Sequence, residues 1–260
     1  MGYISLTLIL SKRTLTTCAL ERKEFMIYFD DLPLDKEILT ALGELSINYA
    51  FQSIFYPDGK TVFAREALMR PTDMSVTDLI NKYTKENKLH ILEVATIFGA
   101  MQEYLLRGYT ENICLNSFPT ECFNQEESQA FWDYYGESDI ASIIMEILEY
   151  PVFSEKMAKV KKDFYKNYST PISIDDFGSG VNNMKVVDFY DPSLVKIDRT
   201  LLMNVDKEPE KQEKITNLIK ELHSKNVYVV AEGVETKGEF DFMVSAGADF
   251  LQGYYLHKPE

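Results

Sequence analysis

Polar side chains stand at the ends of short apolar segments along most of this chain. The set comprises Glu66, Asn116, Glu146, Asp175, Asp176, Lys196, Glu232 and Gln252. Carboxylate and amide oxygens are the ligands that hard cations such as Mg²⁺ and Mn²⁺ prefer. Two such ions lying a few ångströms apart assist displacement at phosphorus, and the adjacent Asp175 and Asp176 could bridge them. The residue types therefore predict a carboxylate centre for two divalent cations.

Each of these positions, taken alone, also fits a simpler role. A polar residue after a strand is often a helix N-cap or a turn former. That explanation fails for the set, because Glu and Lys are poor caps and seven expected strands end in the same way. We therefore interpret the polar strand ends as one functional site.

The elements that must position these residues alternate along the chain. We expect strands over residues 49–56, 61–68, 112–115, 142–145, 172–174, 194–195, 227–231 and 250–251. The turn sequence at 57–59 joins the first two so tightly that they must be antiparallel. Apolar residues at three-to-four spacing predict helices over 75–86, 88–109 and 212–224, and further helical stretches fall between the later strands.

This alternation predicts a modified TIM-type (β/α)8 barrel with an antiparallel first strand. A chain of 260 residues suits one barrel of roughly 250 residues. In such a barrel the carboxyl ends of the parallel strands converge on one face, which carries the active site. Five carboxylates gathered there would repel one another unless cations neutralise them, which again favours bound metal.

The composition excludes several classes of function. A net charge of −14 argues against general DNA or RNA binding, because an acidic surface repels phosphate backbones. Cys18, Cys114 and Cys122 form no C-x-x-C pair, which argues against a zinc site. No stretch approaches the ~20 apolar residues of a membrane span. Few cysteines and no such span lead us to expect a cytoplasmic protein.

At these residues the chain resembles the EAL domain family, whose active members hydrolyse cyclic di-GMP. The motifs, in order, are Glu66-Ala67-Leu68 with Met69-Arg70, Leu115-Asn116-Ser117, Glu146-Ile147-Leu148-Glu149, Asp175-Asp176-Phe177-Gly178-Ser179-Gly180, Lys196-Ile197-Asp198-Arg199, Glu232-Gly233-Val234-Glu235-Thr236, and Gln252-Gly253-Tyr254 with Lys258-Pro259. Seven motifs in the family's order make the resemblance specific. It covers residues 37–260, and residues 1–36 remain an N-terminal extension of unknown role.

The resemblance implies a ligand set for two ions of Mg²⁺ or Mn²⁺. One ion would be held by Glu66, Asn116, Glu146 and Asp175. The second would be held by Asp175, Asp176 and Glu232.

The resemblance also implies roles beyond metal binding. Lys196 would orient the attacking water and help to lower its pKa, and Gln252 would hydrogen-bond a water in the site. Arg70 would contact a substrate phosphate, while Gln52 and Leu68 would line the dinucleotide pocket. Glu149 would anchor the Asp175–Gly180 loop.

The implied activity is hydrolysis of cyclic di-GMP to linear pGpG in bacterial second-messenger signalling, by a homodimer. Two residues depart from the family pattern: Leu148 stands where threonine is usual, and Ser53 stands where proline is common. Neither departure removes a ligand. Two alternatives stay open: a catalytically silent cyclic di-GMP receptor or protein-interaction module, and an unrelated metal hydrolase on a similar barrel.

Overall fold

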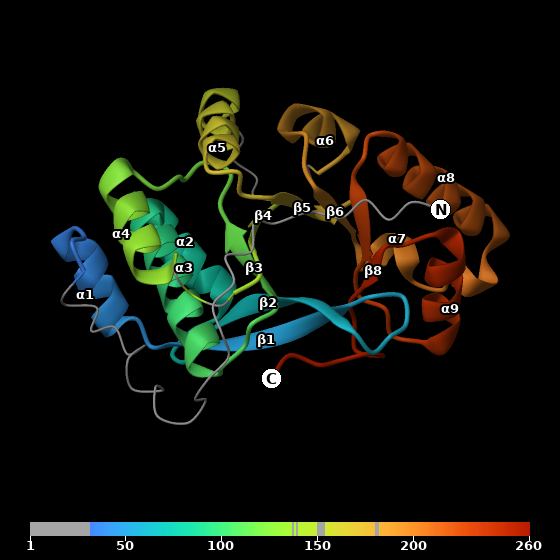
Figure 1. The fold of residues 1–260 in the computed structure, drawn as a ribbon, viewed down its shortest axis with the longest axis horizontal. Helices are drawn as coiled ribbons and strands as arrows, with labels where there is room; N and C mark the ends of the chain where they lie inside the picture. Colours follow the sequence, from blue (N-terminus) through green and yellow to red (C-terminus); the bar gives the residue numbers. More distant parts are fainter. Residues whose placement is uncertain (1–31, 137, 139, 150–153, 180–181) are drawn as a thin grey trace, which may run out of the picture.

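The protein forms a closed barrel of eight strands in the computed structural model (Figure 1). The structure describes residues 32–136, 138, 140–149, 154–179 and 182–260. Most of the N-terminal extension, with Cys18, and Gly180 of the Asp175–Gly180 loop lie outside these ranges. The strands are β1 (Ile47–Phe55), β2 (Val62–Pro71), β3 (Asn112–Ser117), β4 (Ile143–Ile147), β5 (Ile172–Phe177), β6 (Leu194–Ile197), β7 (Tyr228–Ala231) and β8 (Phe250–Leu251).

The expected antiparallel first strand is confirmed. β1 runs antiparallel to both of its neighbours, β2 and β8, and every other neighbouring pair is parallel. The seam between β1 and β8 contains a single residue pair, Phe55 with Leu251. The C-terminal segment supports this seam, since Phe51 and Glu260 exchange backbone hydrogen bonds of 2.8 and 3.2 Å.

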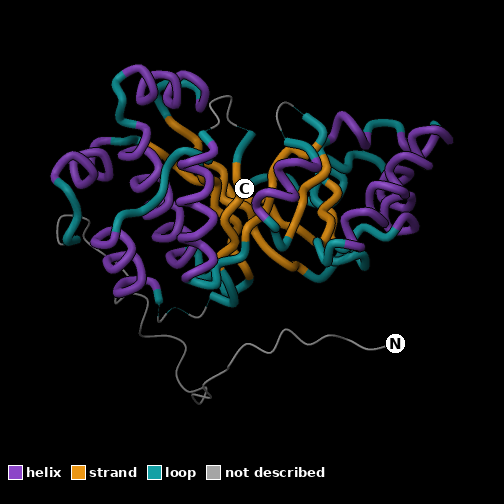
Figure 2. The backbone as a smooth tube through the Cα atoms, turned by 90° about the horizontal axis from the view of Figure 1, so that it is seen from above, coloured by secondary structure: helices purple, strands orange, loops and turns teal. Residues whose placement is uncertain are grey.

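Helices lie on either side of the strands, which occupy the centre of the molecule (Figure 2). They are α1 (Lys36–Glu44), α2 (Val76–Lys85), α3 (Leu89–Leu106), α4 (Gln125–Tyr135), α5 (Glu155–Asn167), α6 (Met184–Tyr190), α7 (Arg199–Leu202), the 3-10 turn η2 (Val205–Lys207), α8 (Pro209–Ser224) and α9 (Lys237–Ala246). The predicted helices over 75–86, 88–109 and 212–224 correspond to α2, α3 and α8. Of the helices in the described ranges, none combines the length and apolar character needed to cross a bilayer.

Several strands extend further than the sequence predicted. β3, β4, β5 and β6 each continue two or three residues past the expected end, so Asn116, Glu146, Asp175 and Lys196 lie within strands rather than after them. The parallel ladder continues through them, as the pairing of Asn116 with Glu146 shows. The strand ends were predicted too early because polar residues have low strand propensity. In the structure these residues nevertheless pair with the neighbouring strands.

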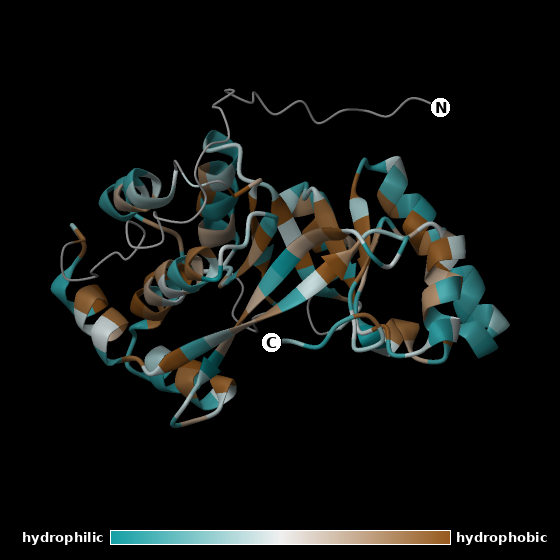
Figure 3. Cartoon of the chain, turned by 60° about the horizontal axis from the view of Figure 1, so that its bottom comes forward, coloured by the Kyte–Doolittle hydropathy of each residue, from teal (hydrophilic) through white to brown (hydrophobic). Residues whose placement is uncertain are grey.

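The barrel interior has an apolar floor beneath a polar layer. Side chains two residues apart on a strand share a face, so the residue two before each polar one lies deeper in the barrel. Most of these deeper residues, together with Ile54 on the antiparallel β1, form one buried apolar cluster: Ala64, Cys114, Ile144, Leu194, Val230 and Phe250. Ser173, two residues before Asp175, is buried but polar. A second, larger core lies between the barrel and the helices. Figure 3 shows the resulting mixture of hydrophilic and hydrophobic positions along the strands.

Candidate metal centre at the mouth of the barrel

The polar residues predicted as a site meet at the carboxyl ends of the parallel strands. Glu66 on β2 lies directly opposite Gln52 on β1. Asn116 and Glu146 form a neighbouring pair on β3 and β4, and Lys196 lies on β6. Glu66, Glu146, Asp175, Lys196 and Gln252 are buried, and Lys196 is 0% exposed. The fold therefore takes charged groups out of water, which it can stabilise only by pairing them or by binding ions.

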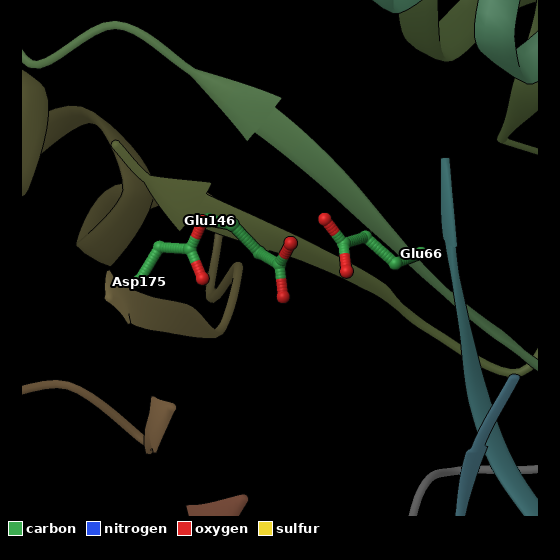
Figure 4. A group of neighbouring side chains, drawn as sticks. All are labelled: Glu66, Glu146 and Asp175. Carbon is green, nitrogen blue, oxygen red and sulfur yellow. The ribbon is translucent and has the colours of Figure 1, made fainter. Parts of the chain in front are cut away.

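Two overlapping groups of carboxylates could hold cations. Oxygens of Glu66, Glu146 and Asp175 lie within 4.8 Å of one another, and these side chains point toward one another in Figure 4. Oxygens of Glu149, Asp175 and Asp176 form a second group with the same limit. Asp175 belongs to both groups, and the second group contains Glu149 rather than Glu232, which was predicted for the second ion.

Lys196 lies in the middle of the carboxylates. Its Nζ is 2.9 Å from Asp175 Oδ1, 3.0 Å from Glu66 Oε2, 3.4 Å from Glu232 Oε2 and 3.5 Å from Glu146 Oε1. Burial alone would lower the pKa of Lys196, but the surrounding carboxylates raise it well above its ordinary value. The ammonium is therefore charged at neutral pH.

The pKa values of the carboxylates shift in different directions, because the carboxylates differ in the hydrogen bonds that they receive. Glu66 Oε2 accepts from Gln252 Nε2 at 2.6 Å and from Lys196 at 3.0 Å. Burial opposes ionisation of Glu66, but the charge of Lys196 and these hydrogen bonds lower its pKa. Burial raises the pKa of Glu146 and of Glu232 well above the usual range, although Lys196 opposes the shift. Burial, and then the charge of Asp175, raise the pKa of Asp176 to about 7.

The oxygens of the centre fit a hard divalent cation. Neither oxygen of Glu146, nor Asp175 Oδ1, nor Glu232 Oε2 accepts a well-formed hydrogen bond from the described residues, although all four atoms are buried. Three of them, Glu146 Oε1, Asp175 Oδ1 and Glu232 Oε2, are ion-paired with Lys196. Buried acceptors almost always have a partner, and oxygen ligands of this kind suit Mg²⁺ or Mn²⁺. The predicted ligands Glu66, Glu146 and Asp175 are thus assembled, and Glu146 and Asp175 contribute oxygens that accept no well-formed hydrogen bond from the described residues. The Asn116 side chain lies beside them and donates to Ala67 O at 3.2 Å.

The loop after β7 is held by a basic side chain. Arg199 Nη1 donates to the carbonyl of Gly233, and Nη2 donates to Glu235 Oε2 at 2.8 Å. Glu239 Oε2 accepts from the backbone amides of Glu235 and Thr236 at 2.9 and 3.1 Å. These contacts fix the backbone that follows Glu232.

A cavity of about 360 Å³ opens beside the carboxylates. Leu68 and Arg70, two of the predicted substrate residues, line it together with Phe118. Gln52 and Gln252, the other two, lie outside its lining. They are buried against Glu66, with Gln252 Nε2 lying 3.3 Å from Gln52 Oε1. The structure therefore separates the four predicted substrate residues into two pairs.

The serine at position 53 forms contacts that a proline could not. Its backbone N–H donates to His257 Nδ1 at 3.2 Å, and its hydroxyl accepts from Arg65 at 3.0 Å. Proline has no N–H, so this departure from the family pattern accompanies a local hydrogen bond. The carbonyl of the same His257 accepts from Gln52 Nε2 at 3.0 Å.

Sequence reasoning missed several residues that support the site. Asn182 donates to the carbonyl of Asp175 at 2.5 Å, and no pattern in the sequence indicated this contact or those of His257. Glu93 and Lys161 form a buried ion pair behind β3. Here a signal existed, since each interrupts the apolar face of its helix, and charged residues are almost never buried unless they are paired.

A sequence model of the EAL domain matches residues 35–259. Among curated relatives, the blue light- and temperature-regulated antirepressor BluF of Escherichia coli K12 is 25% identical over 86% of this chain and 57% of its own length. The probable cyclic di-GMP phosphodiesterase PdeG of the same organism is 27% identical over 64% of this chain and 33% of its own length. The chain thus spans between about a third and just over half of these relatives.

The solved structures agree in fold. A standalone EAL protein from Vibrio cholerae O395, bound to c-di-GMP, superimposes with a TM-score of 0.72 at 25% identity, covering 83% of this chain and 93% of that one. The FimX EAL domain of Xanthomonas citri, in complex with c-diGMP, gives the same TM-score at 15% identity over 86% and 92% of the two chains, and this supports the fold alone. The chain belongs to the EAL domain family.

Proposed function

We propose that this chain is a metal-dependent phosphodiesterase that hydrolyses cyclic di-GMP to linear pGpG in bacterial second-messenger signalling. The observation that carries the proposal is the buried group of Glu66, Glu146 and Asp175, whose oxygens lie within 4.8 Å of one another. Several of the oxygens in this centre accept no well-formed hydrogen bond from the described residues. Relatives named as cyclic di-GMP phosphodiesterases support the choice of substrate.

Two ions of Mg²⁺ or Mn²⁺ complete the proposed centre. Glu66, Asn116, Glu146 and Asp175 hold the first, and Asp175, Asp176 and Glu232 hold the second. When bound, such ions would supply positive charge that stabilises the phosphate and would lower the pKa of a nearby water to about 7. They also allow a chain of net charge −14 to bind an anion. Glu149, close to Asp175 and Asp176, anchors the loop that begins there.

The protein's own groups bind and orient the reactants. Lys196 places its ammonium among the carboxylates and directs a water toward phosphorus. Arg70, exposed at the cavity edge, pairs with a phosphate, and Leu68 packs against the dinucleotide. Gln252 and Gln52 hold Glu66 in place. Attack by water breaks one ester bond and leaves pGpG with a free 5′-phosphate, so no protein nucleophile takes part.

We further propose that residues 37–260 form the catalytic domain, that it acts in the cytoplasm and that it dimerises. No role is assigned to residues 1–36. The second candidate function is a silent receptor for cyclic di-GMP. The resemblance to BluF favours it, because BluF is named as an antirepressor rather than as a phosphodiesterase.

One experiment separates the two functions. The purified chain is incubated with cyclic di-GMP and Mn²⁺ or Mg²⁺, with EDTA as the control, and the nucleotides are separated by chromatography. Metal-dependent formation of pGpG, abolished by Asp175→Asn, supports the enzyme. Intact substrate with either metal, together with binding in a calorimeter, supports the receptor.

A further inference from the structure

A buried ion pair lies behind β3, outside the barrel. Glu93 on α3 is 1% exposed and Lys161 on α5 is 0% exposed, and Lys161 Nζ lies 3.2 Å from Glu93 Oε1. Ser117, which follows Asn116 on β3, lies between them and is also 0% exposed. This group touches none of the metal-centre carboxylates in the contacts described above, so the proposed mechanism gives it no role.

Nearly all hydrogen bonds of this pair go to the segment directly after Asn116. Lys161 Nζ donates to Ser117 Oγ at 2.6 Å and to the carbonyls of Phe118 and Glu121, each at 2.5 Å. Glu93 Oε2 accepts from the Phe118 amide at 2.9 Å, and Glu93 Oε1 accepts from the Ser117 hydroxyl. The two helices therefore hold one short stretch of backbone from both its donor and its acceptor sides.

That stretch needs support because the sheet holds it on one side only. The ladder between β2 and β3 ends at the pairing of Ala67 with Leu115, one residue before Asn116. The ladder between β3 and β4 continues to the pairing of Ser117 with Ile147. On the β2 side, the Asn116 side chain donates to Ala67 O and also hydrogen-bonds Glu66.

A stability role alone does not account for a charged pair at this place. Burying two charges costs desolvation energy, and well-packed apolar residues often serve stability as well or better. The charged pair adds directional hydrogen bonds, which apolar side chains cannot make. These hydrogen bonds fix the positions of Ser117 and Phe118. Phe118 also lines the cavity beside the carboxylates, as Asn116 does.

We infer that Glu93 and Lys161 are positioning residues, which fix Asn116 for metal binding and Phe118 in the wall of the substrate cavity. The inference rests on the proposed metal centre. The partners that orient metal ligands typically change metal affinity about 10- to 100-fold when they are removed. Neither residue touches the reacting groups, so each acts through the backbone after β3.

The test replaces both charges together with apolar residues of similar size, in the full-length double variant Glu93→Leu/Lys161→Met. A single replacement would leave an unpaired buried charge, whereas the double change removes both. We expect a folded protein whose affinity for Mn²⁺, measured by calorimetry, falls about 10- to 100-fold. In hydrogen exchange without metal, the Phe118 amide should lose protection, because its acceptor on Glu93 is gone.

Leu222→Ala in α8 provides the matched control. Leu222 is 0% exposed in the core on another helix, so the change lowers the melting temperature while Mn²⁺ affinity and Phe118 protection stay as in the wild type. If the double variant does not fold, Ser117→Ala keeps the ion pair and is expected to give a smaller loss of Mn²⁺ affinity in the same assay.

The outcomes separate this inference from the proposed function. Wild-type Mn²⁺ affinity and unchanged Phe118 protection in the double variant would overturn the positioning role, as would unchanged affinity in Ser117→Ala where that variant is needed. Absence of Mn²⁺ binding by the wild type would overturn the metal centre itself. In that case, loss of Phe118 protection in the double variant would still show that the ion pair fixes the backbone at Phe118, but not that this serves metal binding.

Discussion

Lys196 Nζ lies 2.9 Å from Oδ1 of Asp175, the carboxylate that both candidate cation groups share. The ammonium is fully buried and also faces Glu66, Glu146 and Glu232 within 3.5 Å. Several carboxylates at such short range repel one another strongly unless a cation lies among them. Lys196 therefore acts as a counter-ion within the fold in addition to its proposed role toward water.

The first prediction concerns Lys196→Met. Removing one member of a buried ion pair leaves uncompensated charge and costs about 3–5 kcal/mol, so in EDTA the free energy of unfolding should fall by an amount of this order. Added Mn²⁺ should raise the melting temperature more in the variant than in the wild type, because the metal then supplies the missing positive charge. Turnover of cyclic di-GMP should be lost.

Lys220→Met is the control for this change, because Lys220 is exposed on α8 and its replacement should leave unfolding and turnover unchanged. Calorimetric melting with EDTA and with Mn²⁺ measures both effects. An Lys196→Met protein that melts at the wild-type temperature in EDTA would contradict the counter-ion role.

Gly233 gives a second prediction, for Gly233→Ala. Its φ of +71° lies in the left-handed region, and a Cβ there would lie 2.6 Å from Cβ of Arg199. The left-handed conformation alone costs a non-glycine residue about 1–2 kcal/mol. The collision would also displace the backbone after Glu232, so turnover should fall together with stability.

Gly43→Ala serves as the matched control in urea unfolding. Gly43 lies in α1 with nothing within 4 Å of an added Cβ, so alanine should stabilise the protein by up to about 1 kcal/mol through helix propensity. Equal stability of Gly233→Ala and the wild type would show that the loop relaxes without strain.

Arg70 carries a third prediction. Its exposed guanidinium lines the cavity beside the carboxylates, and a hydrogen bond to a charged group contributes about 1.5–3 kcal/mol. Arg70→Ala should therefore weaken cyclic di-GMP binding about 10- to 100-fold, as measured by calorimetry. Affinity for Mn²⁺ should not change, because Arg70 is not a metal ligand. Unchanged nucleotide affinity would remove Arg70 from the substrate site.

The sequence predicted the barrel and the gathering of the site because both depend on local patterns. Glu66, Glu146 and Lys196 were predicted at the ends of short apolar segments, and parallel strands necessarily bring their carboxyl ends together. The strands that carry Glu146 and Lys196 were predicted to end before these residues, because ladder pairing across the barrel outweighs the weak strand propensity of charged side chains.

The supporting contacts could not be predicted in the same way. The hydrogen bond between Gln52 and His257 joins residues 205 positions apart, and the pair of Glu93 and Lys161 joins two helices 68 positions apart. Such contacts depend on how the elements pack in three dimensions. The charged residues in apolar helix faces indicated that a partner existed, but they did not identify it.

His90 carries the fourth prediction, which concerns pH. Its ring nitrogens face two carboxylates, with Nε2 2.9 Å from Glu127 Oε1 and Nδ1 3.5 Å from Glu121 Oε2. Glu121, and then Glu127, raise the pKa of His90 to about 10. An NMR titration should therefore find the imidazole still protonated at pH 8, whereas an unperturbed histidine is neutral there.

The raised pKa fixes the direction of its effect on stability. The folded state binds the proton more tightly than the unfolded state, whose histidine has a pKa of about 6.5. The stabilisation is therefore complete below pH 6.5 and is lost as the pH rises toward about 10.

The difference in unfolding free energy between the wild type and His90→Gln should be larger at pH 6 than at pH 10. His223→Gln, at a histidine paired with the single carboxylate of Asp249, is the control for general effects of removing an imidazole. A wild-type advantage that stays constant or grows between pH 6 and pH 10 would contradict a charged His90 joining α3 to the start of α4.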